Sequence, residues 1–211
     1  MIAVIQCAAK KRRDAGFLRT LAGKPVMFVA DPASAPVDAE LKYARPDDPF
    51  NGSTSWRDEL IRYNREPNGN PLKLLPAIEL YENPAYAKLA NRFGLQNVYV
   101  LSAGWGLISG GFLTPFYDVT FSPRAELYKK RRRNDEYRDF SMLPDSRDHL
   151  VFFGGKDYLP LFNKLSAKYP GHRTVFHNSK VPPSAPGCQL QKFETTTRTN
   201  WHYECVAAFV A

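Results

Sequence analysis

Four short apolar runs, each ended abruptly by small or polar residues, constrain the fold of this chain most strongly. They span residues 2–5, 98–101, 149–153 and 173–176. Such runs are typical of buried strands, and helix-like segments alternate with them, which favours a parallel α/β sheet with right-handed crossovers. We therefore expect a three-layer α/β fold in which helices flank a central, parallel four-stranded sheet.

Polar side chains and glycines follow each of these runs. In an open α/β sheet, ligands bind at the carboxyl ends of the strands, so we expect the residues after the runs to converge on one crevice. Gln6, Cys7 and Lys10 follow the first run; Ser102, Trp105, Tyr117 and Asp118 follow the second; Gly154, Gly155 and Tyr158 follow the third; and His177, Asn178 and Ser179 follow the fourth.

Two of these side chains carry candidate chemistry. The imidazole of His177 suits proton transfer or stabilisation of a developing anion; a hydrogen-bonded structural histidine is the alternative. Cys7 is a candidate nucleophile because nearby lysines favour the reactive thiolate; the alternative is a small buried side chain. Residues 154–156 read Gly-Gly-Lys but lack the earlier glycine and the Ser/Thr of a P-loop. We expect no cofactor and no metal.

The length of 211 residues fits a single domain. Segment 24–76 is rich in proline and irregular, which favours a functional lid or a flexible insertion. Within it we expect a helix from Ser53 or Ser55 to Tyr63, with a capping box between Ser55 and Asp58; its Trp56, Arg57, Arg62 and Arg65 suit a lid over a phosphate backbone or a solvated helix face. Further helices are predicted over 76–93, from Tyr158 to Lys168, and at the C-terminus with Thr199 as its cap.

Positive charge indicates a polyanionic partner. The net charge is +8 and the isoelectric point is near 9.4, which favours nucleic acid first and an anionic membrane second. The expected contacts to the phosphate backbone are Lys11, Arg12, Lys129, Lys130, Arg131, Arg132 and Arg133. A solvated, exposed helix is the alternative for residues 129–133.

Cysteine use and hydropathy indicate the compartment. The three cysteines are an odd number without paired short spacing, which argues against a disulfide framework and a four-ligand zinc site. No apolar run approaches membrane length and no charged-then-apolar leader opens the chain. We expect a cytoplasmic monomer without a membrane partner.

The order of strands and loops is similar to the uracil-DNA glycosylase fold. In that family a polar loop follows the first strand, and a His-Pro-Ser loop follows the last strand and inserts at the DNA minor groove. His177-Asn178-Ser179 matches the histidine and the serine but lacks the proline. The first loop matches only at Gln6, so the water-activating aspartate of that family is not carried over.

A second resemblance covers roughly residues 1–13 and 97–180. The Cys-x-x-Lys loop at residues 7–10, the Leu-Ser-Ala-x-x-Gly-Leu segment at 101–107 and Tyr117-Asp118 resemble a group of bacterial and phage proteins. The peroxide-stress protein YaaA, which is linked to DNA binding, is similar to this group. So is the core domain of archaeosine synthase, which acts on a modified 7-deazaguanine in tRNA. The resemblance implies a nucleobase within nucleic acid as the target, and a role in defence or phage biology.

These observations lead to three hypotheses. The first is a DNA N-glycosylase that flips a modified base onto Trp105 or Tyr158, with Asp118 orienting water or stabilising the sugar cation and His177 stabilising the departing base. The second is a DNA-binding protein without catalysis. The third is a transferase acting on a modified base through Cys7. The same crevice would also suit a free nucleotide.

Overall fold

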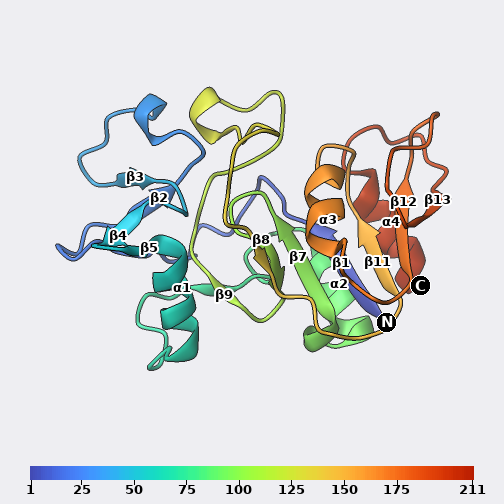
Figure 1. The fold of residues 1–211 in the computed structure, drawn as a ribbon, viewed down its shortest axis with the longest axis horizontal. Coiled ribbons are helices and arrows are strands. Elements are labelled where there is room, and N and C mark those ends of the chain that lie inside the picture. Colours follow the sequence, from blue (N-terminus) through green and yellow to red (C-terminus); the bar gives the residue numbers. More distant parts are fainter.

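The four predicted strands form the centre of a larger sheet (Figure 1). The computed structural model describes residues 1–211. The central strands are β1 (Ile2–Gln6), β7 (Val98–Ser102), β11 (Leu150–Phe153) and β12 (Arg173–His177). They run parallel in the order β7-β1-β11-β12, which confirms a mostly parallel α/β sheet. The expected number of four strands was wrong, because the sheet has seven.

Three further strands extend the two edges of the sheet. β8 (Gly106–Ser109) returns antiparallel to β7, β10 (Phe140–Ser141) pairs parallel with β8, and β13 (Gln189–Lys192) pairs parallel with β12. The turn into β8 requires glycine, since Gly106 has φ +91° and a Cβ there would lie 2.6 Å from the Phe140 carbonyl oxygen. The chain therefore reverses directly after β7 and does not cross over.

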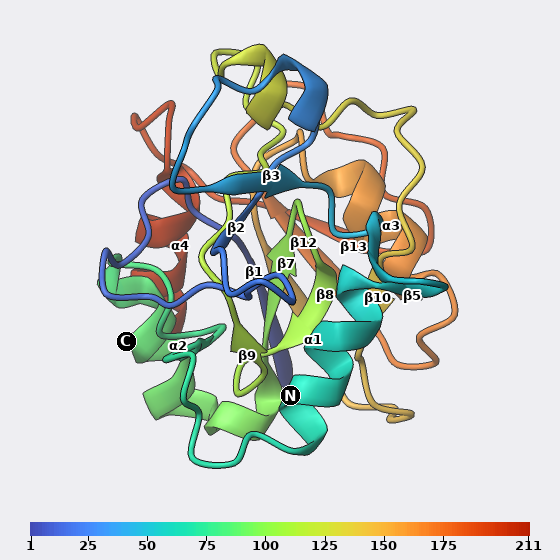
Figure 2. The ribbon, with the colours of Figure 1, turned by 90° about the vertical axis from the view of Figure 1, so that its left-hand side faces the viewer.

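Helices cover both faces of the sheet (Figure 2). α2 (Pro84–Phe93) and α4 (Trp201–Val210) pack against each other on one face, and α3 (Leu159–Ser166) lies on the other. The helix predicted over 76–93 begins only at Pro84, because proline fits the first helical turn and Asn83 caps it. Thr199 does not cap α4, whose N-cap is Asn200 in a left-handed conformation.

Segment 24–76 is built from short elements. They are β2 (Val26–Phe28), the 3-10 helix η1 (Pro32–Ser34), β3 (Lys42–Ala44), β4 (Pro49–Asn51), β5 (Thr54–Ser55), α1 (Trp56–Arg65) and β6 (Leu75–Pro76). β6 pairs with β9 (Leu113–Thr114). Two further 3-10 helices lie elsewhere in the chain, η2 (Leu95–Asn97) and η3 (Leu127–Lys129). The capping box between Ser55 and Asp58 is confirmed. Figure 1 shows this segment at the end of the molecule remote from β12 and β13.

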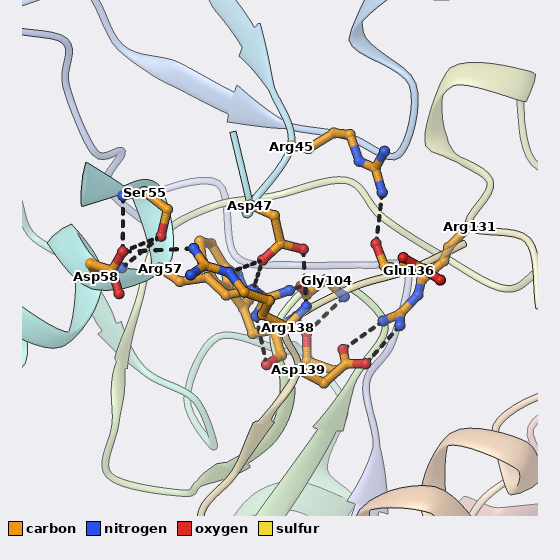
Figure 3. Close-up of polar contacts among 12 residues, drawn as sticks. Arg45, Asp47, Ser55, Arg57, Asp58, Gly104, Arg131, Glu136, Arg138 and Asp139 are labelled. Carbon is orange, nitrogen blue, oxygen red and sulfur yellow. Dashed lines mark hydrogen bonds and ion pairs between the residues drawn. The ribbon is translucent and has the colours of Figure 1, made fainter. Parts of the chain in front are cut away.

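Aromatic side chains join segment 24–76 to the sheet, and so do the polar contacts of Arg57 shown in Figure 3. The rings of Phe28 and Trp105 meet edge to face with centroids 4.9 Å apart. The buried guanidinium of Arg57 donates to the carbonyl oxygens of Gly104 at 2.7 Å and Trp105 at 3.0 Å, and pairs with Asp47. Trp56 is also buried. Trp56 and Arg57 therefore form neither the surface of a lid nor a solvated helix face.

Arg131 holds the same loop from the other side. Its guanidinium donates to the Ala103 carbonyl oxygen at 2.8 Å and forms a bidentate pair with Asp139, both bonds being 2.7 Å long. Both side chains of the pair are almost fully buried. The predicted contact between Arg131 and phosphate was wrong, because a polyanion cannot reach a guanidinium whose donors are already bonded inside the protein.

We predict that Arg131→Met destabilises the protein by roughly 3 to 5 kcal/mol, because the substitution leaves the Asp139 carboxylate buried without its guanidinium. Chemical denaturation measures the free energy of unfolding. The exposed neighbour provides a matched control, since Arg132→Met should change stability by less than about 0.5 kcal/mol. Equal effects of the two substitutions would contradict this account of the Arg131 ion pair.

Candidate functional site

A cavity of about 950 Å³ lies at the carboxyl ends of β1, β11 and β12. Three of the four strand ends converge there, as the sequence predicted. The predicted residues in its wall are Gln6, Cys7, Lys10, Gly154, Gly155, Tyr158, His177, Asn178 and Ser179. The starts of α2 and α4 and the loop at residues 120–124 also contribute to the wall, whereas no residue of segment 24–76 does. The site therefore forms without the segment that was expected to cover it.

The structure does not bring the residues after β7 into the cavity wall. Ser102 lies behind it, with its Oγ accepting from the Gly104 and Trp105 amides and donating to the Tyr117 hydroxyl at 2.8 Å. Trp105 and Tyr117 are fully buried, so Trp105 cannot stack on a base without unpacking from the core. Asp118 is partly exposed, but its carboxylate is bound to Lys129 at 2.9 Å.

Gln6 is oriented by the backbone of the third loop. The Gly155 amide donates to Gln6 Oε1 at 2.6 Å, which fixes the orientation of the side-chain amide and leaves its NH₂ group free for a ligand. Gly154 allows this tight turn, since a Cβ there would lie 2.3 Å from the Phe152 ring. The wall thus presents a fixed hydrogen-bond donor.

His177 is the last residue of β12 and is 7 % exposed. Its Nδ1 lies 3.3 Å from Ser179 Oγ. The side-chain amide of Asn178 donates to the Thr197 carbonyl oxygen at 3.3 Å, which leaves the Asn178 oxygen available as an acceptor. This loop supplies a proton-carrying ring and polar groups to the same cavity.

Cys7 is buried in the wall directly after β1. Its Sγ lies 3.2 Å from the Tyr158 hydroxyl and 3.5 Å from the Ala103 amide. Burial raises the pKa of Tyr158 well above its ordinary value, so the phenol keeps its proton at neutral pH and can donate to the sulfur. The thiol therefore faces two hydrogen-bond donors.

Some of the cations predicted to contact the phosphate backbone already form ion pairs within the protein, and others do not. Lys130, Arg132 and Arg133 form no ion pair, whereas Arg12 pairs with Asp14 and Lys129 pairs with Asp118 and Glu126. Burial lowers the pKa of Lys129, but the hydrogen bonds that its ammonium donates to Glu126 and Asp118 outweigh this effect and raise the pKa overall. Lys11 is buried and cannot contact phosphate at the surface, which corrects the prediction for that residue.

Three cations at the cavity were missed by the sequence interpretation. Arg124, Lys156 and Arg198 are exposed, line the cavity and form no ion pair, whereas Lys10 pairs with Glu82. The three come from separate loops, so only the tertiary fold places them around one opening.

No protein-family model matches this chain, and no curated protein or solved structure is significantly similar to it. The site is therefore interpreted from its own geometry. No group of three or more His, Cys, Asp and Glu side chains is placed to hold a metal ion. None of the helices is long and apolar enough to cross a bilayer.

His202, at the start of α4, is a further wall residue that the sequence interpretation missed. It is 2 % exposed, and its Nε2 has no hydrogen-bond partner. Burial lowers its pKa to about 4, so the ring is neutral at physiological pH. Nothing in its local sequence distinguishes it from a surface position of an amphipathic helix.

Stability should fall in mild acid because of His202. In the unfolded chain His202 binds a proton near pH 6.5, but in the folded chain only near pH 4. The neutral, buried ring therefore contributes fully to the stability of the fold above pH 6.5, and this contribution is lost as the pH falls towards 4. We predict that the wild type loses about 2 kcal/mol more than His202→Phe between pH 7.5 and pH 5, measured by denaturation. Tyr203→Phe, on the adjacent residue, should keep the wild-type dependence. An identical loss in His202→Phe would contradict the assignment.

Proposed function

We propose that this chain is an enzyme that cleaves the N-glycosidic bond of a modified base in double-stranded DNA. The cavity at the strand ends is the observation that supports this most strongly. Its volume of about 950 Å³ lies within the range of roughly 300 to 1,000 Å³ that small-molecule sites occupy. A base flipped out of the helix would enter it, because duplex stacking hides the glycosidic bond from any enzyme.

The wall groups suit recognition and release of a base. The free NH₂ group of Gln6 would donate to a carbonyl oxygen of the base, and the orientation set by Gly155 means that little ordering is required on binding. His177 would stabilise the base as it departs with the electron pair of the glycosidic bond. Trp105 and Asp118 take no direct part in this proposal, because neither lines the cavity.

The surroundings of the cavity suit a phosphate backbone. Arg124, Lys156 and Arg198 lie at the cavity without carboxylate partners, and exposed unpaired cations are the groups that bind phosphates with release of counterions. In the uracil-DNA glycosylase family, which the order of strands and loops resembles, the loop after the last strand inserts at the minor groove. In this chain that loop carries Val181, which is 77 % exposed and would fill the space left by the flipped base.

We predict strand breaks in an abasic-site assay. The protein would be incubated with unmodified DNA and with phage DNAs that carry different modified bases, followed by alkali. Breaks should be confined to one modified DNA. His177→Gln should slow base release by on the order of 100-fold and leave DNA affinity unchanged. His172→Gln is the control, because His172 precedes the amino end of β12, whereas His177 lies at its carboxyl end.

Full activity of His177→Gln would contradict the role of the imidazole. Absence of breaks with every DNA, together with tight and salt-sensitive binding, would favour the second candidate function, a DNA-binding protein without catalysis. The unpaired cations support that candidate equally.

The cations should also set the salt dependence of DNA binding. We predict that Arg124→Gln, Lys156→Gln and Arg198→Gln each reduce the slope of log Kobs against log salt concentration by about 1. Fluorescence anisotropy with a labelled duplex measures the slope. Arg65→Gln, at the C-terminal end of α1 and outside the cavity wall, should leave the slope unchanged. An unaltered slope in all three cavity variants would place the DNA elsewhere.

A further inference from the structure

Cys7 is buried at the edge of the hydrophobic core, and two polar groups contact its sulfur. The Ala103 amide and the Tyr158 hydroxyl both approach its sulfur. The Cys7 amide donates to the Leu101 carbonyl oxygen at 2.9 Å, so the position of the side chain is fixed by the sheet. Hydrogen-bond donors directed at one atom favour negative charge on that atom. The thiol also lines the cavity, which gives a bound ligand access to it.

Lys11 brings a positive charge to the same region. Its side chain is 6 % exposed, and its Nζ lies 4.3 Å from the centre of the Tyr117 ring. No carboxylate forms an ion pair with it, since Asp118 is bound to Lys129. Burial lowers the pKa of Lys11, and electrostatic attraction to Cys7 and then Asp118 opposes this effect. The Tyr117 ring that Lys11 contacts carries a hydroxyl that accepts from Ser102 Oγ at 2.8 Å, and the amide of the next residue, Ala103, donates to Cys7 Sγ. Lys11 and Cys7 therefore lie against the same buried cluster.

We propose that Cys7 is the covalent nucleophile of the base-releasing reaction and that Lys11 is its counter-ion. This inference rests on the proposed function and specifies its mechanism. The thiolate electron pair forms a bond to C1′ of the flipped nucleotide while the C1′–N bond breaks. The base leaves with the electrons of that bond and takes a proton from His177.

The second step restores the enzyme. Water attacks C1′, the C1′–S bond breaks, and the sulfur leaves as the thiolate beside Lys11. His177 takes a proton from the attacking water, which returns the ring to its initial state and leaves an abasic sugar. A free base could attack the same intermediate in place of water, so the site would also catalyse base exchange.

Alkylation by iodoacetamide tests the pair of Cys7 and Lys11 without any DNA. The rate at each cysteine would be followed at pH 7 by peptide mass spectrometry. Lys11→Met should slow alkylation of Cys7 by on the order of 10-fold, and Lys11→Arg should restore most of the rate. Cys188, which is partly exposed and outside the cavity, serves as the internal control. Equal Cys7 rates in wild type and Lys11→Met, with melting temperatures matched, would overturn the role of Lys11.

Covalent trapping tests the nucleophile. Labelled duplex carrying the modified base that the abasic-site assay identifies would be mixed with protein, quenched in acid and separated on a denaturing gel. Wild type and Cys188→Ala should form a protein–DNA adduct, whereas Cys7→Ala should form none and should lose base release. Base release by Cys7→Ala at the wild-type rate would overturn this inference and leave the proposed function intact. Absence of release by the wild type would overturn the proposed function and the C1′ step together, with the alkylation result standing independently.

Discussion

The loop from Ala103 to Trp105 is held by two buried guanidinium groups, and the rest of the structure depends on this arrangement. Arg57 bonds the carbonyl oxygens of Gly104 and Trp105, and Arg131 bonds that of Ala103 (Figure 3). The Ala103 amide of the same loop donates to Cys7 Sγ at 3.5 Å. Segment 24–76, through Arg57, and Arg131 therefore support the loop that contacts Cys7, although neither segment 24–76 nor Arg131 lines the cavity.

The cavity wall includes uncharged polar groups, and exposed cations lie around it. Inside, Gln6, His202 and Tyr158 offer polar groups without net charge, since burial lowers the pKa of His202 to about 4 and raises that of Tyr158. Outside, the unpaired arginine and lysine side chains supply positive charge. A neutral base attached to an anionic backbone has the complementary distribution of charge. This complementarity is a second reason, after the cavity itself, for proposing a nucleic-acid substrate.

The sequence predicted the centre of the sheet because the four apolar runs are buried on both faces, which local hydropathy records. It missed β8, β10 and β13, since short edge strands acquire their pairing from distant residues. The dependence on distant residues also explains why the site was predicted only in part. Three strand ends converge as predicted, but after β7 the chain reverses at Gly106, which buries Trp105. His202 was missed because only the packing of α4 brings it to the cavity.

A crystal structure of Cys7→Ala bound to a duplex with the modified base tests the central claim most directly. We predict that the base lies outside the DNA double helix and inside the cavity. Its carbonyl oxygen should be within hydrogen-bonding distance of the Gln6 amide, and its sugar C1′ should face position 7. A duplex with every base stacked, bound through its phosphates while the cavity stays unoccupied, would contradict the account.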